Sequence, residues 1–110
     1  SKGVVVVISS YSGWTWSPMA GVAYGASKTA LQVLTRSLNS QEAASGVRAC
    51  NLCPGDVDSD FLALRPSVPD AAARAVMLSP ADVAQAVRFV IEAPAHVRVD
   101  ELVISPVSQV

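Results

Sequence analysis

Blocks of apolar and polar residues alternate along the chain and predict three strands and two helices. Residues 4–8 are continuously apolar and β-branched, which is typical of a strand buried on both faces of a parallel sheet. Residues 47–53 and 102–104 predict two further strands. Apolar residues recur at helical spacing over about residues 22–45, and Gly46 follows as a natural helix stop. We therefore expect a first strand that is central in a complete sheet, although only residues 47–53 of this chain can lie beside it, followed by a long helix.

The second helix has the clearer start signal. Ser79 is suited to cap it, Pro80 to occupy its first position, and an acid follows three residues after the cap. This helix is expected to end before Pro94. Residues 9–21 are predicted to form a loop, and residues 56–78 an irregular segment with one helical turn, which is a candidate lid.

The order strand, helix, strand, loop, helix, strand is typical of an α/β fold. It predicts part of a doubly wound parallel sheet, with about three strands and flanking helices. A length of 110 residues, with 51% apolar and 15% charged residues, suits one domain. A net charge of −1 argues against nucleic-acid binding, and the apolar runs are too short to cross a membrane. No secretory signal is recognisable, so the expected location is cytoplasmic.

The two cysteines have the spacing of a redox pair or of half a zinc site. Cys50 and Cys53 have no second pair of ligands nearby in the sequence, and His96 is the only histidine. We interpret them as buried thiols in a strand, and we predict no metal site.

Three short motifs stand where strands end or where the next helix begins. Because parallel strands bring their carboxyl ends to one edge of a sheet, where α/β proteins bind ligands, we expect the three to form one site. In chain order they read Ser9-Ser10-x-x-Gly13, Tyr24-Gly-Ala-Ser-Lys28 and Pro54-Gly55-x-Val57-x-Ser59.

The second motif indicates proton transfer. Tyr24 and Lys28 are one helical turn apart, and a neighbouring ammonium stabilises the phenolate form of a tyrosine. Such a tyrosine can give a proton to a carbonyl oxygen or take one from an alcohol, while Ser10 hydrogen-bonds the same oxygen. No side chain can supply a hydride, so reduction of a carbonyl would need a cofactor.

In order and spacing, these motifs resemble the C-terminal half of the short-chain dehydrogenase/reductase family, over essentially the whole chain. The resemblance implies that residues 1–110 are the C-terminal part of a single Rossmann-type NAD(P)-binding domain. It also implies NAD or NADP as the cofactor, a small-molecule carbonyl/alcohol substrate, and a homodimer or homotetramer. In that family the helix with the Tyr-Lys pair commonly forms the interface, so the face around Ala30, Leu34 and Leu38 is expected to pack on a partner subunit.

The resemblance also implies the site residues. Ser10, Tyr24 and Lys28 take the catalytic positions, although the distance from serine to tyrosine is one residue longer than usual and leaves Ser9 as an alternative to Ser10. The cofactor contacts are assigned to Tyr24, Lys28, Pro54, Gly55, Val57 and Ser59.

Two questions stay open at this point. The chain has no glycine-rich phosphate-binding loop, so we expect it to be inactive alone. The alternative to an enzyme is a non-catalytic, truncated fragment that keeps the motifs and cannot bind a dinucleotide. The apolar residues of the first loop, Trp14, Trp16 and Met19, either cap the core or line a substrate pocket.

Overall fold

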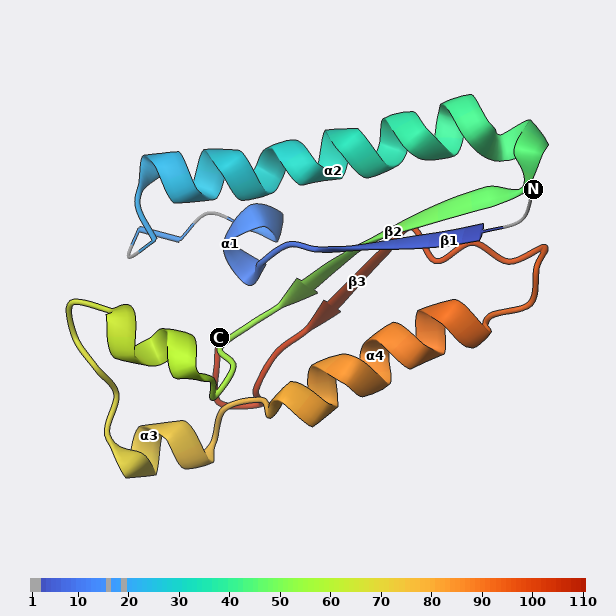
Figure 1. The fold of residues 1–110 in the computed structure, drawn as a ribbon. Helices are drawn as coiled ribbons and strands as arrows, with labels where there is room; N and C mark the ends of the chain where they lie inside the picture. The colour runs from blue at the N-terminus through green and yellow to red at the C-terminus, as the bar shows by residue number, and fades with distance from the viewer. Residues whose placement is uncertain (1–2, 16, 19) are drawn as a thin grey trace.

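A parallel three-stranded sheet forms the centre of the structure. The computed structural model describes residues 3–15, 17–18 and 20–110. Its strands are β1 (Gly3–Ile8), β2 (Val47–Pro54) and β3 (Glu101–Ile104), paired in the order β1-β2-β3. The predicted α/β architecture, with three parallel strands and flanking helices, is therefore confirmed (Figure 1).

β2 is the central strand of the three described strands, and β1 pairs with β2 alone, as expected if residues 47–53 are the only neighbour that this chain offers it. β1 pairs on one edge only, and its side chains are exposed or half-buried, with Val5 41% and Ile8 45% accessible. In β2, by contrast, every residue from Ala49 to Pro54 is buried. A β-branched run favours extended backbone and apolar surroundings, but the covering of a strand depends on which elements lie over it. Here the covered strand is β2.

Two long helices enclose the sheet from opposite faces (Figure 1). On one face lies α2 (Val22–Glu42), which continues into the 3-10 turn η1 (Ala43–Ser45) and stops at Gly46, where φ is 75°. On the other face lies α4 (Pro80–Glu92), which begins with the predicted cap. Ser79 and Asp82 satisfy each other's backbone amides at that cap, in a complete capping box.

The two segments expected to be irregular contain short helices. α1 (Tyr11–Trp14) follows β1 directly, and the Ser10 hydroxyl caps it. After β2 come the 3-10 helix η2 (Asp60–Leu64), anchored by the buried Leu62, and α3 (Ala71–Ala75). α3 is the helical turn predicted within residues 56–78, whereas α1 and η2, of four and five residues, are too short for a hydrophobic period to reveal them.

Asn39 completes the pairing of β2 at the end where β3 has not yet begun. Its amide nitrogen donates to the carbonyl oxygen of Ala49 at 2.9 Å, and its amide oxygen accepts from the Ala49 N–H at 2.7 Å. Farther along this edge of β2, the hydrogen-bond partners come from β3 and the residue before it: the Asn51 N–H donates to the Asp100 carbonyl oxygen. Asn39 is 7% exposed, so this helical side chain replaces a strand partner inside the core.

We expect Asn39→Ala to destabilise the fold. The substitution leaves a buried N–H and a buried C=O of Ala49 without partners, which should lower the free energy of unfolding by about 2 kcal/mol or more. The neighbouring exposed Ser40 offers the control Ser40→Ala, which should change it little. Urea denaturation of the complete protein measures both, and equal effects would contradict the role of Asn39.

Candidate active site at the carboxyl edge of the sheet

The carboxyl ends of the strands meet at one edge, beside α1 and the first turns of α2 (Figure 1). The Ser9 N–H donates to the carbonyl oxygen of Leu52 at 2.7 Å, which joins the end of β1 to β2. The Gly55 N–H donates to the carbonyl oxygen of Ile104 at 2.7 Å, which joins the end of β2 to β3. This edge therefore carries the first and third motifs, and the second begins the helix next to it.

The two candidate serines differ in how their hydroxyl groups are used. Ser9 is 5% exposed, and its hydroxyl donates to the carbonyl oxygen of Lys28 at 3.1 Å. Ser10 is half-buried, and its hydroxyl oxygen accepts from the Ser12 N–H at 3.2 Å. Ser9 thus ties the end of β1 to the helical turn that carries Lys28, whereas Ser10 retains a proton that it can donate.

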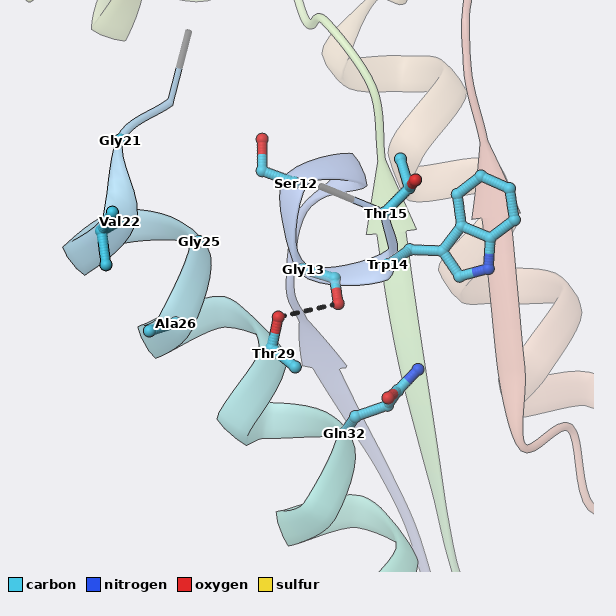
Figure 2. Close-up of a pocket in the computed structure, with 10 residues that line it drawn as sticks. All are labelled: Ser12, Gly13, Trp14, Thr15, Gly21, Val22, Gly25, Ala26, Thr29 and Gln32. Carbon is cyan, nitrogen blue, oxygen red and sulfur yellow. Dashed lines mark hydrogen bonds between the residues drawn. The ribbon is translucent and has the colours of Figure 1, made fainter. Parts of the chain in front are cut away.

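Gly13 lets α1 approach α2 closely. A Cβ atom on Gly13 would lie 2.7 Å from the Ser9 hydroxyl oxygen and 2.8 Å from the carbonyl carbon of Lys28. The same contact includes a hydrogen bond of 3.2 Å from the Thr29 hydroxyl to the Gly13 carbonyl oxygen (Figure 2). Gly13 is therefore fixed by packing, which accounts for the glycine of the first motif.

Tyr24 and Lys28 project from the same side of α2, as their spacing predicts. The Lys28 ammonium nitrogen lies 5.7 Å from the centre of the Tyr24 ring, within the range of a cation–π interaction. Tyr24 is 41% exposed, Lys28 is half-buried, and Lys28 makes no ion pair within the described part of the chain. Both functional groups are therefore open to a ligand.

The third motif leaves the sheet and makes a short extended pairing of its own. Val57 forms an isolated parallel bridge with Leu78, through hydrogen bonds from the Asp58 N–H to Leu78 and from the Leu78 N–H to Asp56. Because neighbouring residues of an extended segment point their backbone groups to opposite edges, the N–H and C=O of Val57 face away from Leu78. Ser59 is half-buried, and its side chain makes no capping bond to η2.

The cysteines are buried free thiols of β2, as predicted. They are three residues apart, so they point to opposite faces of the sheet. Burial is the main cause that raises the pKa of both thiols, to about 11 for Cys50, and the Glu101 carboxylate adds to it. Both thiols therefore stay protonated near neutral pH, which makes them poor nucleophiles.

Sequence reasoning missed a polar cluster under α2. The Glu101 carboxylate accepts from the side-chain amide of Gln32 at 2.6 Å and from that of the fully buried Asn51 at 3.3 Å. Gln32 is one helical turn beyond Lys28, so the cluster fixes the helix with the Tyr-Lys pair to β3. The partners are 69 and 50 positions apart in the sequence, and no local spacing marks them.

A hollow of about 330 Å³ lies between α1 and the first half of α2 (Figure 2). Trp14 is 46% exposed and lines this hollow, so it is not a core cap. Trp16 and Met19 lie outside the described residues.

Within the described ranges no helix is long and apolar enough to cross a membrane. Nor do those residues include three or more His, Cys, Asp or Glu side chains placed to hold a metal ion.

Comparison with known proteins identifies one family. Residues 1–68 match the family model described as short chain dehydrogenase. An uncharacterized oxidoreductase of Staphylococcus saprophyticus is 34% identical over 107 residues, which are 97% of this chain and 43% of that protein. The chain therefore spans less than half the length of the curated relatives it matches.

Solved structures of similar proteins share the fold. A serine dehydrogenase complexed with NADP+ is 30% identical with a TM-score of 0.83, covering 97% of this chain and 45% of that one. An alcohol dehydrogenase of the archaeon Thermococcus sibiricus, complexed with 5-hydroxy-NADP, is 30% identical with a TM-score of 0.77 and covers 97% and 43%.

The close approach at Gly13 leads to a matched pair of glycine substitutions. Gly13→Ala should lower the free energy of unfolding by about 1–3 kcal/mol, because the new methyl group overlaps Ser9 and Lys28. Gly25→Ala is the control: the nearest atom to its Cβ would be 3.9 Å away, and alanine favours a helix by about 1 kcal/mol. Thermal melts of the two variants of the complete protein should shift in opposite directions, and equal shifts would contradict the packing role.

Proposed function

Because the chain belongs to the short-chain dehydrogenase/reductase family, we propose that it supplies the catalytic part of an oxidoreductase that transfers a hydride between NAD or NADP and a small carbonyl/alcohol substrate. The observation that carries the proposal is the attachment of the Tyr-Lys helix to the end of β1. The Ser9 hydroxyl bonds the Lys28 carbonyl oxygen, so the turn with Lys28 is held beside the strand-end serines.

In this proposal the third motif and Lys28 hold the nicotinamide end of the cofactor. The outward N–H and C=O of Val57 match the hydrogen-bonding groups of a carboxamide, and the Ser59 hydroxyl lies two residues further on. The Lys28 ammonium, which has no ion-pair partner in the described chain, can bond the hydroxyl groups of a ribose. Tyr24 contacts the same ribose, and the buried Pro54 with Gly55 shapes the turn. The bound nicotinamide supplies or accepts the hydride.

Tyr24 then handles the proton. Its hydroxyl donates to the oxygen of a carbonyl that is being reduced, or accepts from an alcohol that is being oxidised. The Lys28 ammonium nitrogen lies 5.7 Å from the centre of the same ring. We favour Ser10 over Ser9 as the serine that bonds the substrate oxygen, because the Ser9 hydroxyl already donates to Lys28. The Ser10 hydroxyl is used only as an acceptor.

We further propose that residues 1–110 are the C-terminal part of one dinucleotide-binding domain and that turnover needs the remaining part. The chain contains no glycine-rich phosphate-binding motif, and it covers less than half of its relatives. The alternative is a non-catalytic fragment that keeps the motifs. An activity assay distinguishes the two, because a complete protein without activity would support the alternative. The cytoplasmic location stays a prediction.

The exposed face of α2 fits the proposed homodimer or homotetramer. Val22, Val33 and Leu34 are 85%, 63% and 55% exposed, and Ala26 and Ala30 lie between them. We propose that a second copy of the protein covers this face. Leu38, assigned to it from the sequence, is half-buried in its own chain, so the proposed interface is centred nearer the start of the helix.

Tyr24→Phe should remove activity in the complete enzyme. Without the proton donor we expect kcat to fall by at least about 10²-fold, while the dissociation constants of NADH and NADPH change little. Tyr11→Phe, the change at the only other tyrosine, serves as the control and should keep its activity. Steady-state assays with a panel of small ketones and alcohols measure both, and activity of Tyr24→Phe within tenfold of the parent would refute the assignment.

Leu34→Lys should separate the subunits. A charge on the covered face of α2 cannot be desolvated without a partner, so we expect a folded monomer. Leu64→Lys, at a residue of η2 that is 77% exposed, should leave the assembly intact. Light scattering after size-exclusion chromatography gives the molar masses, and an unchanged mass for Leu34→Lys would remove α2 from the interface.

A further inference from the structure

The C-terminal turn packs against the start of the third motif. After β3, the Gln109 N–H donates to the carbonyl oxygen of the buried Pro106 at 3.0 Å, which closes a turn. The Gln109 side-chain oxygen then accepts from the Asp56 N–H at 2.9 Å. In Figure 1 the C-terminus accordingly lies beside the segment that leaves β2. The end of the chain thus binds the backbone immediately after the Pro54-Gly55 turn.

Gly55 provides an independent observation of the same contact. A Cβ atom on Gly55 would touch the side-chain oxygen of Gln109 and would lie 3.1 Å from its amide carbon and 3.0 Å from the Ser105 Cβ. The Gly55 φ angle is not in the left-handed region, so this glycine is not required by backbone conformation. The space beside it is occupied by the Gln109 side chain, which a methyl group at residue 55 would displace.

Two contacts therefore hold the loop from Gly55 to Asp58. Leu78 pairs with it through the bonds to Asp56 and Asp58, and Gln109 holds the Asp56 N–H. Val57 lies between the held amides, and its own N–H and C=O are directed away from Leu78. The direction of the Val57 groups consequently depends on both contacts.

We propose that Gln109 is a positioning residue for the nicotinamide-binding loop: its side chain fixes the turn at Gly55 and Asp56 and thereby aims the backbone groups of Val57. This inference rests on the proposed function, because it assigns Gln109 to the loop that holds the carboxamide. In this proposal Gln109 acts through its contacts with Gly55 and Asp56.

The first test is hydrogen exchange, which needs no cofactor. In the complete protein, Gln109→Ala should raise the exchange rate of the Asp56 amide by roughly 3- to 10-fold, since one hydrogen bond is lost. Gln109→Glu keeps an oxygen at the same reach and should retain most of the protection. Ser108→Ala, at the exposed neighbouring residue, is the control and should exchange like the parent. An unchanged exchange rate of the Asp56 amide in Gln109→Ala would refute the proposal that Gln109 holds this amide.

The second test separates positioning from stability. Gln109→Ala should raise KM for NAD or NADP by roughly 3- to 10-fold, leave KM for the carbonyl substrate and the melting temperature nearly unchanged, and be rescued by Gln109→Glu. A melting temperature that falls in step with activity, or equal changes in both KM values, would show a merely structural role and refute the proposal. If the parent protein binds neither NAD nor NADP, the proposed function fails, and the cofactor role of Gln109 fails with it. If the parent binds and Gln109→Ala binds equally well, only the role of Gln109 fails.

A double-mutant cycle tests whether a side chain at residue 55 and the Gln109 side chain compete for the same space. Gly55→Ala should weaken cofactor binding in the parent, because the methyl group displaces the Gln109 side chain. In the Gln109→Ala background the same change should have a smaller effect, since the displaced side chain is already absent. Additive effects of the two substitutions would contradict the proposal.

Discussion

The close contact between α1 and α2 at Gly13 is the constraint on which the site depends. At this point the backbones approach so closely that a methyl group on Gly13 would overlap Lys28. Two hydrogen bonds use the short distance, one from the Ser9 hydroxyl to Lys28 and one from the Thr29 hydroxyl to Gly13. Because Tyr24 precedes Lys28 on the same rigid helix, fixing this turn also fixes the tyrosine relative to the end of β1.

The short β3 makes a side-chain amide necessary near the start of β2, whereas at the other end β3 reaches Pro54. β3 has four residues and β2 has eight, so β3 cannot satisfy the whole edge of its neighbour. Asn39 supplies the partner for Ala49 near the start of β2, and Gln109 holds the Asp56 N–H just beyond its end. The Asn39 carboxamide suits its place because it offers both a donor and an acceptor, whereas Gln109 uses only its acceptor oxygen.

Local signals in the sequence predicted most of the helices and strands. They could not show which strand the helices cover or which distant residues pair with one another. α2, α4 and β2 were predicted because helical period, caps and apolar runs involve neighbouring residues. β1 is more exposed in this chain than its apolar run alone suggests, because the burial of a strand depends on what lies over it. For the candidate site, the motif residues were predicted from their order in the chain, and the reason for Gly13 appeared only in three dimensions. Gln109 lies 53 positions from Asp56, and no local pattern links them.

Burial divides the reactive groups of the chain into two sets. Cys50 and Cys53 lie in the core, where desolvation raises the pKa of each thiol and keeps it neutral at physiological pH. They contribute packing, and nucleophilic chemistry through a thiolate is unfavourable there. Tyr24 and Lys28 lie instead on a helix turn that solvent reaches, one pointing a phenol and the other an ammonium into the same region. The proposed proton transfer by the phenol, assisted by the ammonium, therefore uses groups that solvent and a ligand can reach.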